Sequence, residues 1–592
     1  MKRLRTRAAA RLSVLVATSA CALFALIPGA LATHGGDREV TVASNDAIFS
    51  QNKQNEPAIA VDAAHPNILA AGANDNIDME ACNAGDDTTC PFTPDVGGSG
   101  VYFSFDSGDT WTQPEYTGLT ARGCLGEVGP DDPDCQVVDG PIGTLPHYDE
   151  AHLVSDGDPA VAFGPSPAAD GSFSWDNGSR LYYANLSSNV SASLGEPGVK
   201  GFEGIAVSRT DDVAAAAAGD ESAWMAPVIA SKQSSATFAD KEQIWADNAS
   251  SSPFFGNVYV CFASFTGNGA APMRVSRSTD GGDTWSTRQV SPAHNVAPSH
   301  FGQSGCTIRT DSNGGTYVFW EEFTSGSLPT IGTHFMVKST DGGVSWTRPQ
   351  AIRKVTDPCF FVDPVIGRCV EDGVAGARND LAAAPSVDIA NGAPTGADAT
   401  NFMLTAWADG RDGLNNEHVL VSSSTNGTSW SAPAAIETAG DRGYYAAPAL
   451  SPNGTDAYVV YNAFTTPFRD DTTSPRSLVG VVKHADVTSG GLGAWSTLNR
   501  GATGDPRGSS QNDLTAEFLG DYVYAVATRT YGAAVWNDAR NASDCPAIDA
   551  WRMSLRTEDT SDDVARPAPQ QDCDPTFGNT DIFGWSGLDP TP

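Results

Sequence analysis

The stretch Ser278-Thr-Asp-Gly-Gly-Asp-Thr-Trp285 recurs along this chain of 592 residues. Its other copies are Ser104-Phe-Asp-Ser-Gly-Asp-Thr-Trp111, Ser339-Thr-Asp-Gly-Gly-Val-Ser-Trp346 and the shorter Ser424-Thr-Asn-Gly-Thr-Ser-Trp430. Each copy follows a run of strand-forming residues and leads into another short strand. The Asp carboxylate can accept backbone N–H bonds within its own turn, and glycine supplies positive φ. The repeat therefore predicts tight hairpins whose closing Trp fills the gap between packed sheets.

Tryptophan spacing predicts the size of the repeating unit. Trp224, Trp285 and Trp346 are each 61 residues apart, and Trp430 and Trp495 are separated by 65 residues. We interpret Trp224 and Trp495 as the ends of two units whose hairpin sequence has diverged. A period of this length suits a four-stranded blade of a β-propeller with generous loops, and six blades can be counted by their closing Trp.

A second recurring pattern predicts the innermost strand of each blade. The segments are Glu56-Pro-Ala-Ile-Ala-Val, Asp158-Pro-Ala-Val-Ala-Phe, Gln243-Ile-Trp-Ala, Cys306-Thr-Ile-Arg, Pro385-Ser-Val-Asp-Ile and Pro448-Ala-Leu-Ser. One further set follows Trp495, with strands expected within 518–527 and 532–540 and at Trp551-Arg-Met-Ser-Leu. The alternating run Glu39-Val-Thr-Val-Ala43 could supply the fourth strand of that set, so that both termini close the ring without a free sheet edge. The count favours an all-β, single propeller of seven blades, and six blades is the alternative.

The hairpin repeats resemble the Asp-boxes, or bacterial neuraminidase repeats, of the sialidase-like β-propeller family. In that family the boxes are structural and lie on the outer hairpin of a blade. The resemblance therefore implies that Asp106, Asp280 and Asp341 are not catalytic. Seven blades would depart from the family pattern, because its catalytic sialidases have six.

Residues 1–32 are expected to be a secretory signal peptide. Five basic residues precede an apolar run over 12–26, and Ala30-Leu31-Ala32 forms a small-residue cleavage site. A lipoprotein interpretation would use Cys21, for which Thr18-Ser19-Ala20 is a poor lead-in. We expect a secreted, extracellular protein with a propeller over 33–558. Residues 559–592 are expected to form a tail packed on its surface.

The cysteines predict a disulfide framework. Ten of the eleven remain after removal of the leader, and an even number in an exported protein indicates disulfides rather than a metal site. We predict five bridges between neighbours in sequence order: Cys82–Cys90, Cys124–Cys135, Cys261–Cys306, Cys359–Cys369 and Cys545–Cys573.

The charge of the chain limits its partners. A formal charge of −36 argues against binding to nucleic acid or to anionic membrane surfaces. After the leader, no apolar run approaches the roughly 20 residues needed to span a bilayer. We expect a monomer whose partner is an extracellular carbohydrate or cell-surface glycan.

Polar residues just before the inner strands are the candidate site, because inner strands and their loops converge on the axis of a propeller. The candidate catalytic residues are Asp158, Asp240, Glu242, Asp380, Tyr444 and Glu517. The candidate substrate-binding residues are Arg378, Arg442, Lys241 and Tyr522. The competing structural interpretation is that Asp and Asn at such positions close Asx-turns.

The family resemblance implies a defined catalytic set: three arginines for the substrate carboxylate, a Tyr nucleophile paired with a Glu, and an Asp acid/base. The first arginine normally lies in an Arg-Ile-Pro segment near the N-terminus, and that segment is missing here. Between the leader and residue 120 the only arginine is Arg38. The sialidase arginine motif is therefore incomplete.

Two functions stay open at this point. One is a sialidase-like glycoside hydrolase acting on extracellular glycans, for which two carboxylates across a central pocket suffice. The other is a non-catalytic propeller that binds carbohydrate or protein. We expect no cofactor. Calcium is possible at Asp156-Gly-Asp-Pro or Asp131-Asp-Pro-Asp, but neither has the spacing of a recognised calcium loop.

Overall fold

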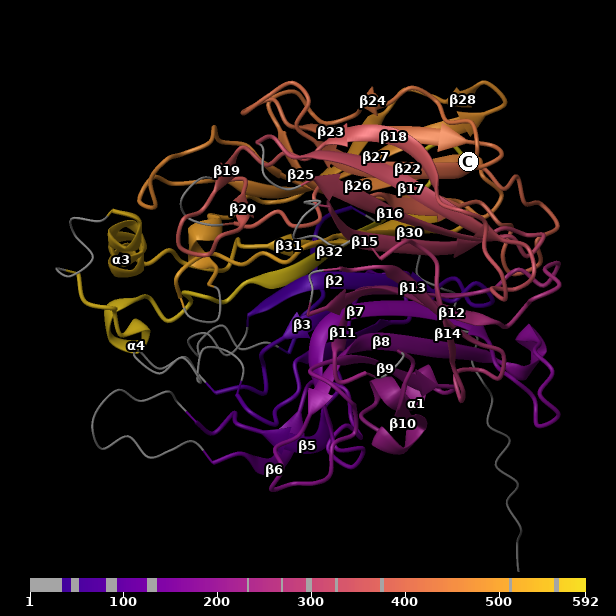
Figure 1. The fold of residues 1–592 in the computed structure, drawn as a ribbon, viewed down its shortest axis with the longest axis horizontal. Helices are drawn as coiled ribbons and strands as arrows, with labels where there is room; N and C mark the ends of the chain where they lie inside the picture. The colour runs from indigo at the N-terminus through magenta and orange to yellow at the C-terminus, as the bar shows by residue number, and fades with distance from the viewer. Residues whose placement is uncertain are drawn as a thin grey trace, which may run out of the picture. The chain divides into compact units, whose positions relative to one another are not determined.

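The computed structural model describes residues 35–43, 53–80, 93–124, 136–231, 234–267, 270–293, 301–324, 328–372, 377–510, 514–557 and 564–592. Seven antiparallel sheets form a seven-bladed β-propeller (Figure 1), which confirms the predicted fold class and the favoured blade number. The expected signal peptide lies outside the described residues. Among those that are described, no helix is long and apolar enough to cross a membrane.

The blades follow one another along the chain, and each runs from an inner to an outer strand. Blade 1 contains β2 (Gln54–Val61), β3 (Leu69–Asp75) and β4 (Ser99–Ser104), with Thr112 bridging Phe103 at its outer edge. Blade 2 contains β7 (Leu153–Pro165), β8 (Ser179–Asn189), β9 (Gly204–Thr210) and β10 (Trp224–Ile229). Blade 3 contains β11 (Thr237–Ala246), β12 (Val258–Thr266), β13 (Met273–Ser278) and β14 (Ser286–Gln289).

The next three blades repeat this order. Blade 4 contains β15 (Phe301–Thr310), β16 (Thr316–Thr324), β17 (Ile331–Ser339) and β18 (Gln350–Thr356). Blade 5 contains β21 (Ser386–Ile389), β22 (Met403–Asp409), β23 (His418–Ser424) and β24 (Ala434–Ala435). Blade 6 contains β25 (Arg442–Leu450), β26 (Asp456–Phe464), β27 (Leu478–Thr488) and β29 (Ser496–Arg500), and β28 (Gly491–Leu492) pairs with the end of β27.

Blade 7 closes the ring with strands from both ends of the described chain. Its order is β30 (Tyr524–Ala527), β31 (Tyr531–Asp538), β32 (Asp581–Leu588) and β1 (Arg38–Glu39). The N-terminal strand is therefore the outermost one, and Val40 N continues the pairing by donating to Ile582 O at 2.8 Å. Closure from both termini was predicted.

The third strand of blade 7 is not the one that the sequence suggested. Residues 551–555 lie in helix α3 (Pro546–Arg556), and the strand is β32, inside the segment expected to be a surface tail. In α3 the buried Ile548 and Trp551 are three residues apart, as on one face of a helix, and Pro546 occupies its first turn. The expected boundary at residue 558 therefore does not separate the propeller from a tail.

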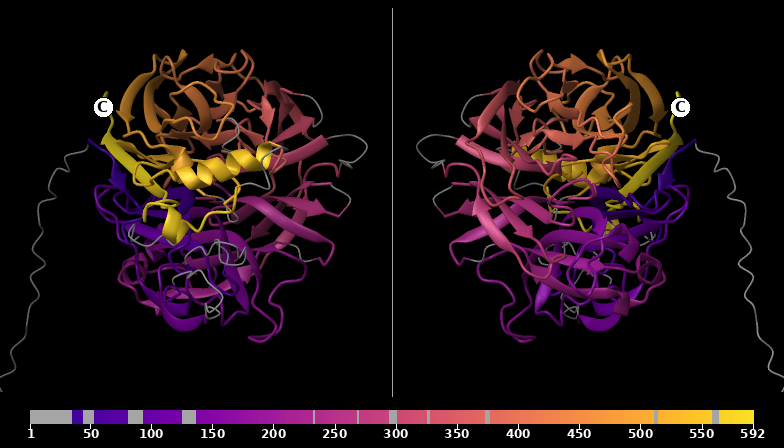
Figure 2. Two further views of the ribbon diagram at one scale, coloured as in Figure 1. Left: turned by 90° about the vertical axis from the view of Figure 1, so that its left-hand side faces the viewer. Right: turned by 90° about the vertical axis from the view of Figure 1, so that its right-hand side faces the viewer.

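Short elements decorate the ring. They are the hairpins β5 (Tyr116–Thr120)–β6 (Val138–Ile142) and β19 (Phe361–Val362)–β20 (Cys369–Val370), helices α1 (Val213–Ala217) and α4 (Pro569–Asp572), and 3-10 turns at Trp175–Asn177, Glu221–Ala223 and Pro506–Gly508. Figure 2 shows α3 over one face of the ring. Arg556 of α3 pairs with Asp363, which lies in the loop between β19 and β20. Helix α3 and the β19–β20 hairpin therefore lie on the same face of the ring.

The repeated hairpins lie at the outer edge of their blades and fasten neighbouring blades together. In blade 3, Asp280 Oδ1 accepts Thr284 N at 3.0 Å and the Ser278 hydroxyl at 2.7 Å. The carbonyl oxygen of Gly281 in this turn accepts Arg180 Nη1 of blade 2 at 2.8 Å. Their position away from the axis agrees with the predicted structural role.

The interior is built from small residues near the axis and larger ones between blades. Buried alanines such as Ala58, Ala160 and Ala246 occupy the inner strands, where sheets converge. Gly72 of β3 shows how tight the blade contacts are, since a Cβ there would lie 2.7 Å from the Tyr183 hydroxyl oxygen. That hydroxyl donates to Gly100 O at 2.7 Å and joins blade 2 to blade 1.

Three of the predicted disulfides are present: Cys261–Cys306, Cys359–Cys369 and Cys545–Cys573. The first joins blade 3 to blade 4, and the last fastens the start of α3 to the segment after α4. Cys124 is also disulfide-bonded. Its expected partner Cys135, and the expected Cys82–Cys90 pair, lie outside the described residues.

Candidate functional site

A shared backbone irregularity turns side chains toward the axis at the start of the inner strands. Strands β2, β7, β11 and β15 each carry a register shift near their N-terminal ends. At the shift the backbone is left-handed, with φ of 56° at Glu56, 51° at Asp158, 56° at Lys241 and 65° at Gly305. A bulge of this kind re-aims one side chain. Left-handed non-glycine residues are rare and concentrate at functional sites, which makes this set a candidate site.

Asparagines on neighbouring strands hold two of these bulges in place. Asp158 N donates to Asn74 Oδ1 at 2.7 Å, and Glu56 N donates to Asn537 Oδ1 at 2.9 Å. Both residues precede a proline, which disfavours helical backbone angles. A strained conformation costs on the order of 1–3 kcal/mol and persists only where surrounding bonds fix it. These amide side chains provide that support.

Lys241 is the centre of a buried ionic cluster. Its Nζ lies 2.6 Å from Asp521 Oδ2, 2.9 Å from Asp158 Oδ2 and 3.5 Å from Glu56 Oε1. Arg378 adds a second cation, with Nη2 at 3.2 Å from the same Asp521 oxygen. We call these five residues the axial cluster. They come from blades 1, 2 and 3 and from the segments that precede blades 5 and 7.

The carboxyl groups of the axial cluster hold protons unequally. Burial, together with the charge of Asp158, raises the pKa of Glu56 well above its ordinary value. Burial opposes ionisation of Asp158 as well, but Lys241 and a hydrogen bond from Glu56 lower its pKa overall. Asp521 is also shifted downward, because Arg378 and Lys241 outweigh the effect of burial on its pKa. Burial and the neighbouring charges therefore favour a proton on Glu56 over one on Asp158 or Asp521.

Two further carboxyl groups flank Lys241 and are partly exposed. Burial raises the pKa of Asp240 to about 6, with Lys241 opposing the shift and Asp158 adding to it. Asp380 keeps 22% of its side chain exposed, and burial and Asp521 raise its pKa against the opposing charge of Arg378. Asp240 belongs to blade 3 and Asp380 to the segment before blade 5. The two therefore approach the cluster from different blades.

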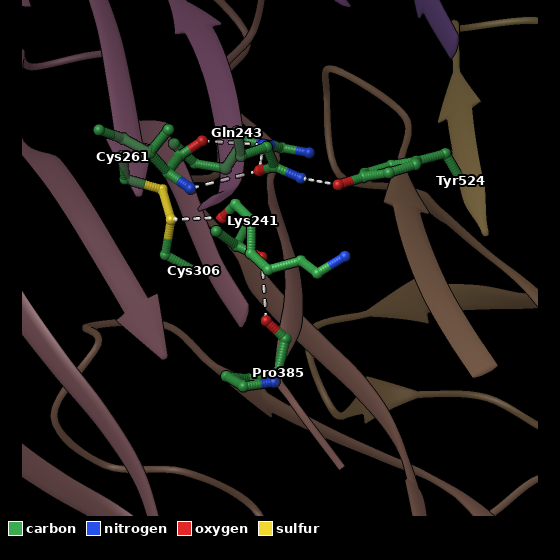
Figure 3. Close-up of a disulfide and its surroundings, with 9 residues drawn as sticks. Lys241, Gln243, Cys261, Cys306, Pro385 and Tyr524 are labelled. Carbon is green, nitrogen blue, oxygen red and sulfur yellow. Dashed lines mark hydrogen bonds between the residues drawn. A yellow bond between two sulfur atoms is a disulfide. The ribbon is translucent and has the colours of Figure 1, made fainter. Parts of the chain in front are cut away.

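A polar contact crosses between blade 3 and blade 7 next to the cluster. Gln243 donates to the Tyr524 hydroxyl across the axis, and its Oε1 accepts Arg309 Nη1 at 2.8 Å (Figure 3). A cavity of about 50 Å³ above this contact is lined by Lys241, Asp521, Tyr522, Tyr445, Cys306 and Pro385, among others. The Cys261–Cys306 disulfide borders it, with Cys306 Sγ 3.7 Å from Lys241 O. We call this cavity together with the axial cluster the mouth.

Most of the predicted site residues meet at this mouth. Asp158, Lys241, Arg378, Asp240 and Asp380 do so through the contacts described above, and Tyr522 lines the cavity. Glu242 is buried beside them, and burial followed by the charge of Asp158 raises its pKa well above the ordinary value. Tyr444 is fully buried, and its hydroxyl donates to Arg378 O, so it supports the arginine from below.

Two predicted residues lie elsewhere. Arg442 forms a bidentate pair with Glu417 at 2.9 and 3.0 Å and donates to Glu371 O at 2.6 Å. Glu517 is fully buried, and burial and Asp372 raise its pKa. Arg476 and Arg552 surround Glu517, and Arg552 comes from α3. Neither residue contacts Lys241 in the described part of the chain, because each is held in a separate cluster beside the axis.

Sequence reasoning missed two members of the axial cluster as site residues. Glu56 was recognised as a polar residue at the start of an inner strand but was not among the candidate site residues, and Asp521 was placed inside an expected strand. The available signal for Asp521 was a charged residue after Gly520 within an apolar run. Gly520 has φ of 79°, and a Cβ there would lie 2.5 Å from Glu56 Cγ. The glycine therefore permits the close approach of the two segments.

The chain matches no protein-family model and no curated protein. Among solved structures, it is similar to the Hadza microbial sialidase Hz136, with a TM-score of 0.38 and 12% identity over 69% of this chain and 63% of that one. The intramolecular trans-sialidase from Ruminococcus gnavus gives a TM-score of 0.36 and 11% identity, covering 72% and 94% of the two chains. A polysaccharide lyase of family PL25, an ulvan lyase, gives 0.37 and 11%, covering 82% and 92%.

The alignment therefore spans less than two thirds of the length of the Hadza sialidase. Similarity this weak supports no conclusion about function. The chemistry of the mouth rests on its own residues.

Proposed function

We propose that this protein is a secreted glycoside hydrolase that acts on extracellular glycans at the mouth around Lys241. The observation that carries the proposal is the placement of two partly exposed carboxyl groups beside the same buried ammonium, with Asp240 on blade 3 and Asp380 on the segment before blade 5. Glycoside hydrolysis requires such a pair, one to protonate the leaving oxygen and one to act as base or nucleophile.

Asp240 is the proposed general acid. Its pKa of about 6 keeps a large fraction protonated in mildly acidic conditions, in which an ordinary Asp is ionised. A carboxylic acid with a pKa near the working pH combines the correct protonation state with a strong tendency to transfer the proton. Asp158, held ionised by Lys241, hydrogen-bonds to Asp240 and keeps the proton on it.

Asp380 is the proposed second carboxyl group. Arg368 and Arg378 both approach Asp380 Oδ2, the latter at 3.7 Å. These two cations stabilise the ionised form of Asp380, which is the form that a base or nucleophile requires. Lys241 and Tyr522 line the cavity and Arg378 contacts Asp521 of its lining, so these residues supply N–H and O–H donors for sugar hydroxyl groups. The positive charges of Arg368 and Arg378 are already paired with Asp380 and Asp521. We therefore expect the mouth to prefer uncharged sugars to polyanions.

Secretion and the expected monomeric state belong to this proposal. The disulfides Cys261–Cys306, Cys359–Cys369 and Cys545–Cys573 support an oxidising compartment. A calcium-dependent reaction has less support, because Lys241 Nζ already occupies the position between Asp158 and Asp521 that a cation would take.

The direct test is a release assay on aryl glycosides, sialosides included, and on extracellular polysaccharides, with purified wild-type protein and the Asp240→Asn and Asp380→Asn variants. We expect hydrolysis of at least one glycoside by the wild type and a loss of about 100-fold or more in kcat for each variant. Asp176→Asn is the matched control, because Asp176 is exposed and lies on a 3-10 turn beyond the C-terminal end of β7, whereas Asp158 is near the N-terminal end of that strand. Variants with full activity would exclude these residues from the chemistry.

A non-catalytic carbohydrate-binding role is the second candidate. This role is favoured because the Lys241 ammonium already contacts three carboxyl groups, each at least nine-tenths buried. In that case a glycan array would show binding without product release, and Arg378→Ala would reduce the binding while Asp240→Asn would not.

A further inference from the structure

A second cluster of ionisable groups lies between blade 6 and blade 7, near the C-terminal end of the chain. Asp456 is the first residue of β26, His484 lies on β27, and Asp589 follows the last residue of β32. One ligand atom from each of the three lies within 4.8 Å of the others. This group is separate from the axial cluster and takes no part in the proposed reaction.

Both carboxylates approach the same imidazole nitrogen. His484 Nε2 lies 3.3 Å from Asp456 Oδ1 and 3.8 Å from Asp589 Oδ1. One N–H can donate a well-formed hydrogen bond to only one of them. Both distances also exceed the 2.7–2.9 Å typical of a charge-assisted hydrogen bond. The single N–H at His484 Nε2 therefore cannot serve both carboxylates at once.

His418 provides a contrast within the same chain. It also lies between two carboxylates, but its Nδ1 is 2.7 Å from Glu437 Oε1 and its Nε2 is 2.7 Å from Asp412 Oδ2. Each of its nitrogens thus has one partner at hydrogen-bond distance, as a protonated imidazole requires. The His484 arrangement differs because two acceptors share one nitrogen.

The spacing at His484 suits a tetrahedral metal. With metal–ligand distances of about 2.0–2.1 Å, the edge of a zinc tetrahedron is roughly 3.4 Å. The two nitrogen–oxygen distances of 3.3 and 3.8 Å lie close to that edge. One imidazole nitrogen and two carboxylate oxygens form a ligand set found in zinc sites, with a fourth position for water.

Outer hydrogen bonds orient both carboxylates of the cluster. Thr455 Oγ1 donates to Asp456 Oδ2 at 2.6 Å, so Oδ1 faces His484 without that competitor. Thr591 N donates at 2.8 Å to Asp589 Oδ1, the oxygen that faces His484, and the second lone pair of this oxygen can serve a metal. Metal-binding carboxylates are commonly oriented by such outer hydrogen bonds.

An unpartnered buried phenol points to the missing fourth group. Tyr458 is the direct cross-strand neighbour of His484, and Asp456, two residues before it, shares its face of β26. Tyr458 is 1% exposed, and its ring centroid lies 5.0 Å from that of His484. Its hydroxyl has no hydrogen-bond partner within the residues that the structure describes. A metal-bound water is the type of group that such a hydroxyl would contact.

We propose that Asp456, His484 and Asp589 bind one Zn²⁺ ion that fastens the C-terminal end of blade 7 to blade 6. The neighbouring contacts already bring the chain end to this place, because Asp589 N donates to Thr530 O at 2.8 Å and Thr591 Oγ1 donates to Asp486 Oδ1. Zinc would add a link across the last seam of the ring and stabilise its closure.

The test uses the tag-free full mature protein after dialysis against a chelator. Zinc content is measured by plasma mass spectrometry after re-addition of Zn²⁺ and gel filtration, and the thermal midpoint is measured with Zn²⁺, with Ca²⁺ and without metal. We expect one zinc per chain, a midpoint raised by Zn²⁺ and not by Ca²⁺, and a tetrahedral Co²⁺ absorption spectrum on substitution. Ca²⁺ is not expected to bind because it takes six to eight oxygen ligands.

The variants separate metal binding from folding. Asp589→Asn keeps an oxygen for the Thr591 N–H and should abolish stoichiometric zinc without unfolding the ring. His484→Gln should do the same, and Tyr458→Phe should weaken zinc binding by about 10-fold, as outer-shell changes do. His418→Gln is the control and should bind zinc normally. Absence of zinc from the wild type, or full zinc content and an unchanged Co²⁺ spectrum in Asp589→Asn, would overturn the proposal.

Discussion

Lys241 Nζ lies 2.6 Å from Asp521 Oδ2, and this ion pair joins the inner strand of blade 3 to the segment that enters blade 7. Lys241 is also the left-handed residue of its bulge, so a local backbone feature places a cation on the axis of the ring. The positive charge of Lys241 on blade 3 thus offsets the negative charge of Asp521, which precedes blade 7, although these two blades share no strand. It links the stability of the propeller to the chemistry of its mouth.

Removing the ammonium should destabilise the fold. Lys241→Met leaves Asp158 and Asp521 buried without their cation, and breaking a buried pair in this way costs about 3–5 kcal/mol. Urea denaturation followed by tryptophan fluorescence measures the loss. Lys354→Met, at an exposed position on β18, is the control and should change stability by less than about 0.5 kcal/mol. Equal stability of the two variants would show that the cluster is not ionised as described.

The activity of the proposed enzyme should fall as the pH rises through about 6. Asp240 must carry a proton to act as the acid, and burial raises its pKa to about 6, so the active fraction is full below that pH and is lost above it. A kcat–pH profile on the best aryl glycoside measures the effect. A glycoside whose leaving group needs no protonation should restore rate to Asp240→Asn, with no descending limb near pH 6. A wild-type profile that is flat from pH 5 to 8 would contradict the assignment.

Buried acids should make the folded protein more stable in mild acid than in mild alkali. Burial raises the pKa of both Asp156 and Asp247 to about 7. A raised folded-state pKa means that the native state binds more protons than the unfolded chain. The stability contribution is therefore complete below the unfolded value near 3.9 and is lost as the pH rises through about 7.

Thermal midpoints at pH 5 and pH 8.5 test this prediction, with the lower midpoint expected at pH 8.5. Asp247→Asn should reduce the difference, because the amide does not titrate. Asp283→Asn should not, since that carboxyl group is 65% exposed. If the wild-type midpoint rose with pH across this range, the native state could not be the one that holds the extra protons.

The outer hairpins should matter for stability and not for chemistry. Asp280→Ala removes the acceptors of Thr284 N at 3.0 Å and of the Ser278 hydroxyl at 2.7 Å, and should cost about 1–2 kcal/mol. Asn426→Ala in the shorter hairpin should cost less, because the acceptor lost there is an uncharged amide. Chemical denaturation gives the free energies, and kcat on the same substrate should stay within twofold of wild type. A large loss of kcat at wild-type stability would contradict a purely structural role.

Much of the fold could be predicted because its repeating unit is held together by local bonds. Asp280 bonds to atoms within four residues of itself, so the hairpin and its closing Trp285 are visible in a single window of sequence. The even Trp spacing then follows from the length of a four-stranded blade. The prediction failed at 551–555, where the sequence forms the amphipathic helix α3, and the true strand lies at β32. A short apolar segment of that kind does not by itself distinguish a strand from a helix.

The candidate site was predicted only in outline. Polar residues ahead of the inner strands were the candidate site, and among them Asp158, Lys241 and Arg378 lie together in the axial cluster. Glu517 and Arg442 occupy comparable places in the sequence, but they are drawn into neighbouring clusters by Arg476 and Glu417. Which carboxylate a cation selects depends on distances between blades, and sequence spacing does not encode those distances.

The sequence alone determined the hairpins, the blade repeat, the pairing of the three described disulfides and the closure of the ring from both ends. The hairpins depend on bonds within a turn and the blade repeat on a regular period, which a short window of sequence displays. The disulfide pairing and the ring closure were predicted from the order of the cysteines and from the requirement that no sheet edge stays free. Only the tertiary structure decided that the pKa of Glu56 is raised while that of Asp158 is lowered, and that Asp456, His484 and Asp589 meet between two blades. Burial and the approach of remote charges set those properties, and both arise only when the blades have closed into a ring.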